Sequence, residues 1–172
     1  MSHNLCERVL PKAWYAVRVR SRFEQVVSTA LREKGYEEFV PLVRSRRRWS
    51  DRVKELRLPL FPGYVFCRFE AHRKTPILAC PAVFDILAFA NRPAAIPNEE
   101  IQAVRAMVES RLAVEPYPFL NLGQRIRIER GPLAGIEGLI VEIKNHYRLV
   151  ASVTLLQRSV CVEIDREWAA KA

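Results

Sequence analysis

The chain has 172 residues, 49% of them hydrophobic, and a formal net charge of +9 at pH 7. This size suits one medium domain or two small ones, while the longest nearly apolar stretch, Ile77–Ala90, contains Pro81 and Asp85 and is too short to span a bilayer. We expect a cytoplasmic protein, because the polar first residues carry no signal-peptide core, and the basic excess predicts a polyanionic neighbour such as nucleic acid.

The first predicted unit is a strand followed by a helix. Trp14–Arg20 alternates and is rich in strand-forming residues. Ser21 and Glu24 have the spacing of a capping box, and Gly35 is placed to end the helix. The apolar residues between them follow helical spacing: Phe23, Val26, Val27, Ala30 and Leu31.

An arginine-rich segment follows, from Val40 to Leu60. We expect an exposed β-hairpin arm with its turn at Ser50 and Asp51. The segment carries seven cations: Arg44, Arg46, Arg47, Arg48, Arg52, Lys54 and Arg57. Such an arm could follow upstream duplex DNA through sequence-independent contacts with phosphates.

The strand Tyr64–Glu70 should place Tyr64 and Phe66 on one face of the first sheet. A short helix near Arg73–Ala79, a strand near Val83–Phe89 and a third helix capped by Asn98 are expected next. Three helices are too few to cover both faces of the sheet. The aromatic face therefore needs the second domain or a separate partner as its cover, unless both aromatic residues are ordinary core residues; periodicity leaves these alternatives open.

The C-terminal part contains only strand signals. Two prolines within Glu115–Asn121 predict a linker, so we expect domains at residues 12–112 and 122–168 with a linker at 113–121. Gly123–Gly138 predicts a strand, a glycine-bearing loop and a second strand. This pattern is typical of a small β-barrel, and it resembles the KOW motif through Gly131, Gly135, Ile136 and Gly138.

No pattern of reactive residues predicts an enzyme. Cys6, Cys67, Cys80 and Cys161 lack metal-ligand spacing, and we expect structural thiols. The histidines have no evident nucleophile partner, and the glycine-bearing loop is no P-loop because it joins two strands. We therefore predict no catalytic residue, no metal and no cofactor.

Three segments resemble the N-terminal domain of the NusG family of transcription elongation factors: WYAVRVRSRFEQVV, LPLFPGYVFCRFE and VFDILAFANRPAAIPNEEI. The match at Phe61–Tyr64 (FPGY) is the most specific, and the likeness extends from about Lys12 to Trp168. The resemblance implies an α+β protein: an N-terminal α/β sandwich and a C-terminal small antiparallel β-barrel of the KOW, SH3-like type.

The resemblance also implies partners and sites. Proteins of this family bind the clamp helices of the largest subunit of RNA polymerase through an apolar patch, which matches Phe61, Pro62, Tyr64, Phe66, Ile86 and Phe89 here. Non-template DNA would lie near four basic residues, Arg18, Arg20, Arg22 and Lys34. The arm residues Arg46, Arg47 and Arg48 would instead contact upstream duplex DNA. The KOW domain would recruit a ribosomal small-subunit protein or Rho. A monomer is expected.

Two questions remain open at this level. The segments RLVASV and LLQRSVCVEI look more like specialised paralogues that serve single long operons than like the general factor. In one specialised member the C-terminal domain can pack as helices over the patch. Here the strand-forming alternation and the glycines favour a β-barrel at rest, with the patch open. The alternative function is a ribosome-associated RNA-binding KOW protein.

Overall fold

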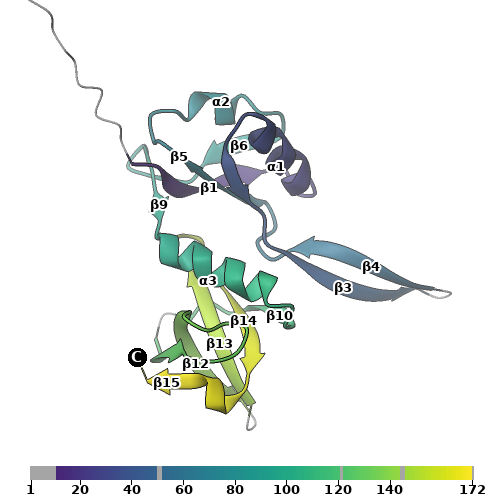
Figure 1. Cartoon of the computed structure of the whole chain (residues 1–172). Coiled ribbons are helices and arrows are strands. Elements are labelled where there is room, and N and C mark those ends of the chain that lie inside the picture. The colour runs from purple at the N-terminus through teal and green to yellow at the C-terminus, as the bar shows by residue number, and fades with distance from the viewer. Residues whose placement is uncertain (1–10, 50–51, 121, 144–145, 172) are drawn as a thin grey trace, which may run out of the picture.

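The computed structural model describes residues 11–49, 52–120, 122–143 and 146–171 (Figure 1). An N-terminal unit is built on one antiparallel sheet, and a C-terminal unit, the β-domain, is built on another. The helix α3 lies between them in the view of Figure 1, and a long hairpin projects from the N-terminal unit. The fold is therefore α+β, as expected.

The N-terminal unit is a sheet with strands in the order β2-β5-β1-β6, and β9 also pairs with β1. Its elements are β1 (Ala13–Val19), α1 (Glu24–Glu33), β2 (Glu37–Phe39), β3 (Leu42–Trp49), β4 (Arg52–Pro59), β5 (Tyr64–Phe69), α2 (Thr75–Leu78), β6 (Val83–Ile86), β7 (Ala88–Phe89), β8 (Arg92–Pro93), β9 (Ala95–Ile96) and α3 (Asn98–Glu109).

Strand alternation divides this sheet between two hydrophobic cores. Tyr15, Val17 and Val65 join Val27 and Leu31 of α1 in the first core. The residues between them on the strands face the other way, where Trp14, Ala16 and Phe66 belong to a second core with Ile101 and Val104 of α3. A period of two therefore gives β1 and β5 two buried faces.

The helix α1 begins later than the capping-box prediction. Phe23 holds the N-cap position without a side-chain hydrogen bond, and Glu24 is the first helical residue. The Glu24 carboxylate instead accepts a hydrogen bond from the Gly63 N–H at 2.8 Å, a tertiary contact that competes with the local one. The predicted end is confirmed: Gly35 has φ +81°, and Tyr36 N–H donates to the Leu31 carbonyl oxygen, as in a Schellman motif.

The arginine-rich segment forms the predicted hairpin. The strands β3 and β4 pair in register from Leu42 opposite Pro59 to Trp49 opposite Arg52. The hairpin extends away from both units in Figure 1. The predicted turn, Ser50 and Asp51, lies outside the described residues, as do the side chains of residues 46–54.

Two further elements are shorter than expected. The helix near Arg73–Ala79 is α2, and the strand expected at Val83–Phe89 divides into β6 and β7. The division occurs at Leu87, whose N–H donates to the Ala16 carbonyl oxygen at 2.9 Å before β7 turns away to pair with β8. Asn98 is the first residue of α3 rather than its cap, and its side chain accepts a hydrogen bond from Trp14 Nε1.

The β-domain is a six-stranded antiparallel sheet in the order β10-β14-β13-β12-β11-β15. Its elements are β10 (Val114–Tyr117), β11 (Gln124–Ile128), β12 (Glu137–Ile143), β13 (His146–Val153), η1 (Thr154–Leu156), β14 (Arg158–Ile164), η2 (Arg166–Trp168) and β15 (Ala169–Lys171). Buried alternating residues form its core: Ile126, Ile128, Leu149, Ala151, Val153, Val160, Val162 and Ile164. The C-terminal part is thus β-structured, as the glycines and alternation predict.

The predicted linker is partly wrong. Val114–Tyr117 forms β10, which pairs with β14 from Val114 opposite Val162 to Tyr117 opposite Ser159. Pro116 is tolerated because β10 lies at the end of the strand order, where a missing N–H need not break a ladder on both sides. The β-sheet therefore includes residues that the two prolines were expected to keep out of regular structure.

Candidate interaction surfaces

The six residues of the predicted polymerase-binding patch do not share one open surface. Phe61 and Phe66 are only 1% and 0% exposed, and their rings meet edge to face at 5.5 Å. Tyr64 is half-buried and Pro62 is exposed. Ile86 belongs to the core beneath α1, on the opposite face of the sheet from Phe66. Phe89 is 83% exposed, at the end of β7.

The β-domain contacts the centre of this patch. Arg158, the first residue of β14, donates a hydrogen bond from Nη1 to the Pro62 carbonyl oxygen at 3.3 Å. Its guanidinium also lies 5.3 Å from the centre of the Tyr64 ring, a cation–π contact. The expectation of an open patch is therefore wrong for this structure, and the β-domain reaches the patch without becoming helical.

The helix α3 connects the two units through both polar and apolar contacts. The Glu100 carboxylate accepts hydrogen bonds from Thr154 N–H at 3.1 Å and from Thr154 Oγ1 at 2.7 Å. Buried side chains of α3 lie in one core with residues of both sheets: Ile101, Ala103, Val104 and Met107. The two units are thus closed against each other around α3.

Arg105 connects α3 to the first sheet through contacts that the sequence does not indicate. Its guanidinium lies 5.4 Å from the Trp14 ring and 5.0 Å from the Phe39 ring, with Glu37 at 3.7 Å. Its Nε atom is buried and has no hydrogen-bond partner. From the sequence alone, an arginine in such a helix is interpreted as a charge exposed to solvent. No neighbouring residue in the sequence indicates that its guanidinium contacts two aromatic rings.

The basic residues predicted to bind nucleic acid lie in three places. Arg18 is held by Asp85, with Nε 3.1 Å from Oδ1 and a second contact through Nη2. Arg20 and Arg22 are exposed where β1 leads into α1, and Arg20 lies 5.2 Å from the Phe23 ring. Lys34 lies past the other end of α1, about 15 Å along the helix axis, so it does not join this group. The backbone of Arg46–Arg48 lies in β3, but these side chains are outside those described.

The glycine-bearing loop has the conformation that its sequence requires. Gly131 and Gly135 have φ of +81° and +89°, values that favour glycine. Gly135 N–H donates to the Ile128 carbonyl oxygen at 2.7 Å, and Ile128 N–H donates to the Ile136 carbonyl oxygen at 2.9 Å, which closes the loop between β11 and β12. The side chain of Ile136 is half-buried, and Gly138 lies in β12.

A matched pair of substitutions tests this loop. We expect Gly135→Ala to cost about 1–2 kcal/mol, because the left-handed backbone is strained for alanine while a Cβ there meets nothing within 4 Å. Gly131→Ala should cost about 1–3 kcal/mol more, since its Cβ would lie 2.8 Å from the Trp168 ring. Urea unfolding of both variants measures the difference. Equal losses would contradict the proposed close packing of Trp168.

The cysteines of the described regions are buried free thiols: Cys67, Cys80 and Cys161. Burial raises the pKa of Cys67 to about 12, with further increases from Glu38, Cys80 and Glu37. Burial also raises the pKa of Cys161. Because the thiolate is the reactive form, the raised pKa values make the Cys67 and Cys161 thiols unreactive at neutral pH.

The described ranges contain neither a metal-binding cluster nor a helix that could span a membrane. Within those ranges no group of three or more His, Cys, Asp or Glu side chains is placed to hold a metal ion. No described helix combines the length and apolar character needed to cross a bilayer.

Comparison with known proteins identifies the family. The family model described as "Transcription termination factor nusG" matches residues 12–105, just over half of the chain. The chain belongs to the NusG family. The match covers β1 through most of α3, so it includes both the Phe61–Phe66 segment and the basic junction between β1 and α1.

Relatives extend the likeness to the β-domain. The transcription termination/antitermination protein NusG of Escherichia coli K12 is 28% identical over 182 residues, covering 94% of this chain and 97% of the relative. The NusG of Vibrio vulnificus is also 28% identical, covering 90% and 92%. These relatives, together with the family model, place the chain among transcription factors.

A solved structure shares the fold over nearly the whole chain. It is described as "Domain interaction in Thermotoga maritima NusG", with a TM-score of 0.53 and 21% identity. The alignment covers 93% of this chain and 97% of that one. The arrangement of an N-terminal α/β unit followed by an antiparallel β-domain is therefore a NusG-type fold.

Proposed function

We propose that this protein is a transcription elongation or antitermination factor that binds the clamp helices of RNA polymerase through the Phe61–Phe66 segment. Family membership and the aromatic character of this segment support the proposal. The observation that supports it most is that Tyr64 is half-exposed at the border of the two units, where the Arg158 guanidinium of the β-domain lies over its ring. Removal of that cover would leave an aromatic surface for a partner.

The β-domain would control access to this surface. The described side-chain hydrogen bonds between the units are those of Arg158 with Pro62 and of Glu100 with Thr154, and all involve exposed groups. Contacts of this kind contribute about 1 kcal/mol each, so most of the cost of separation would come from exposing the apolar core around α3, which a bound partner would have to offset. We propose that polymerase competes with the β-domain for the patch.

Separation of the two units requires a segment between them that belongs to neither sheet. Because β10 belongs to the second sheet, we propose the boundary between the end of α3 at Glu109 and the start of β10 at Val114, rather than at residues 113–121. Arg111, within this connection, has φ +63°. The units joined here would be residues 12–109 and 114–171.

Limited proteolysis with trypsin tests this boundary. We expect the first cut between the two units to follow Arg111, which is exposed and lies between the end of α3 and the start of β10. A substitution Arg111→Gln removes this cleavage point and serves as the control. First cuts after Arg125 or Arg127, both within β11, would contradict the boundary.

Nucleic-acid contact is the second part of the proposal. Arg20 and Arg22 are exposed at the junction of β1 and α1, and we propose that they contact phosphates of the non-template strand. Arg18 would contribute less, since Asp85 already holds its guanidinium. The arm residues Arg46, Arg47 and Arg48 are proposed to contact upstream duplex DNA.

Salt dependence measures these contacts. We expect Arg20→Gln with Arg22→Gln to lower the slope of log affinity against log salt by about one unit per lost phosphate contact in a polymerase–DNA complex. The control pair Arg125→Gln and Arg127→Gln removes the same charge from an exposed face of β11. An unchanged slope in the first pair would make Arg20 and Arg22 solvated surface residues only.

The β-domain is proposed to recruit a second machine, a ribosomal small-subunit protein or Rho, through the loop that contains Ile136. The alternative function is a ribosome-associated RNA-binding protein, which the KOW-like β11–loop–β12 unit favours. Co-purification separates the two: polymerase subunits support the first, and ribosomal particles without polymerase support the second. A specialised role on a single long operon stays a prediction, for which genomic context is the test.

A further inference from the structure

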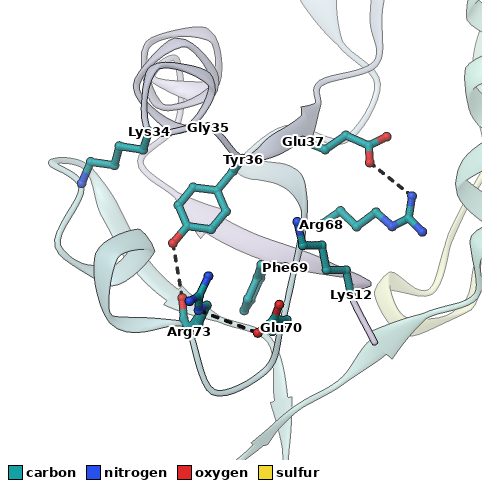
Figure 2. A pocket seen from close by; sticks show the side chains of 9 residues that line it. All are labelled: Lys12, Lys34, Gly35, Tyr36, Glu37, Arg68, Phe69, Glu70 and Arg73. Carbon is teal, nitrogen blue, oxygen red and sulfur yellow. Dashed lines mark hydrogen bonds and ion pairs between the residues drawn. The ribbon is translucent and has the colours of Figure 1, made fainter. Parts of the chain in front are cut away.

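A pocket of about 480 Å³ lies in the N-terminal unit, away from the polymerase-binding patch (Figure 2). It forms where three neighbouring strands end together, because β1 pairs Ala13 with Phe69 of β5 and β2 pairs Glu37 with Arg68 of β5. Nine residues line it: Lys12, Lys34, Gly35, Tyr36, Glu37, Arg68, Phe69, Glu70 and Arg73. Of these, only Lys34 was predicted to bind nucleic acid.

Positive charge exceeds negative charge in this pocket. Four cations, from Lys12, Lys34, Arg68 and Arg73, face two carboxylates. Glu37 lies 3.3 Å from Arg68, and Glu70 lies 3.7 Å from Arg73. Within the described ranges neither lysine forms an ion pair, and Lys34 Nζ donates a hydrogen bond to the Pro76 carbonyl oxygen at 3.0 Å.

The floor and one wall of the pocket are aromatic. Phe69 is 1% exposed and meets the Tyr36 ring edge to face, with ring centres 6.5 Å apart. The Tyr36 hydroxyl donates a hydrogen bond to the Arg73 carbonyl oxygen at 3.5 Å, as Figure 2 shows. A Cβ at Gly35 would meet nothing within 4 Å, so the backbone here borders open space. A small ligand can therefore reach a fixed surface surrounded by cations.

We propose that this pocket binds a phosphate group. A phosphate presents several acceptor oxygens in different directions, which suits cations that come from the start of β1, the end of α1 and the end of β5. A phosphate would also neutralise the positive charge that remains because the four cations outnumber the two carboxylates. The phosphate could belong to a nucleic-acid backbone or to a free nucleotide. The proposal goes beyond the proposed function and does not depend on polymerase binding.

Amide NMR of the isotope-labelled full chain tests the site at constant ionic strength. The probes are inorganic phosphate, ATP and a short oligothymidylate. We expect the Gly35 and Tyr36 amide signals to shift with saturation, because both residues border the pocket. A lower dissociation constant for the oligonucleotide than for ATP would identify the nucleic-acid backbone as the source, and the reverse order would identify a free nucleotide.

Three sets of substitutions make the test specific. Lys12→Gln with Arg73→Gln should weaken phosphate binding by about tenfold, since two charges near the ligand are lost. Glu70→Gln should strengthen it by about threefold, because a competing carboxylate is lost. Arg125→Gln with Arg127→Gln lowers the net charge equally at a distant strand and should leave the dissociation constant unchanged.

Three results would overturn the proposal. One is the absence of saturable shifts at Gly35 and Tyr36 with all three probes. Another is equal weakening by Lys12→Gln with Arg73→Gln and by the control pair, which would indicate a response to net charge alone. The third is failure of Glu70→Gln to strengthen binding. Retained dispersed amide signals of core residues in both units, such as Val65 and Val162, verify that each variant remains folded.

Discussion

Arg158→Ala should raise the apparent affinity of the full chain for RNA polymerase by about five- to thirtyfold. The substitution removes the hydrogen bond to the Pro62 carbonyl oxygen and the cation–π contact with Tyr64, together about 1–2 kcal/mol in favour of the closed arrangement. Because a closed patch lowers the fraction of binding-competent molecules, its opening raises apparent affinity by the same factor. Fluorescence anisotropy with purified polymerase measures the change.

The control for this variant lies within the β-domain. Arg166 places its guanidinium 5.4 Å from the Tyr147 ring, a similar geometry that does not involve the N-terminal unit. Arg166→Ala should therefore leave polymerase affinity unchanged. Equal affinities of wild type, Arg158→Ala and Arg166→Ala would contradict control of the patch by the β-domain.

Phe66→Ala should lower the free energy of unfolding by about 3–5 kcal/mol, the usual loss for a buried phenylalanine. Phe66 is 0% exposed and contacts the rings of both Phe39 and Phe61. Phe89→Ala is the matched control, because Phe89 is 83% exposed and its removal should change stability by less than about 0.5 kcal/mol. Urea unfolding of both variants measures the difference, and similar small losses would contradict the burial of Phe66.

The burial of Phe66 also determines which residue can be substituted to test the proposed polymerase interface. Alternation in the sequence predicts Tyr64 and Phe66 together on an aromatic face, and the structure does place both on the same side of β5. Loss of Phe66 would weaken binding by unfolding the N-terminal unit, whatever its role at the interface. Tyr64, half-buried beneath Arg158, can be replaced with less effect on the core.

The sequence predicted secondary structure well where the signal came from the segment itself. Alternation gave both faces of β1 and the strands of the β-domain, and Gly35 correctly marked the end of α1. Ser21 does not cap α1, because Arg22 has φ +72° and the helix begins only at Glu24, whose carboxylate bonds to Gly63, a residue distant in sequence. Pro116 does not interrupt its strand, because β10 is an edge strand of the sheet. The position of a strand in the sheet depends on the whole fold and cannot be predicted from the segment alone.

The candidate surfaces were less predictable for the same reason. Whether the aromatic face of the first sheet is open depends on how the two units pack, and no local pattern indicated that Arg158 would lie over Tyr64. The basic residues were identified by type, but their partners were not: Asp85 holds Arg18, and α1 separates Lys34 from Arg20. Arg105 was missed because its two aromatic partners come from β1 and β2.

The central claim is that polymerase binds where the β-domain now contacts Tyr64. A photo-crosslinking amino acid in place of Tyr64, in the full chain mixed with elongation complexes and ribosomes, tests it most directly. We predict a crosslink to the largest polymerase subunit that strengthens when Arg158→Ala is added, while the same probe in place of the exposed Leu122 gives none to the clamp helices. Crosslinks from position 64 to ribosomal components alone, or none to polymerase with Arg158→Ala, would contradict the claim.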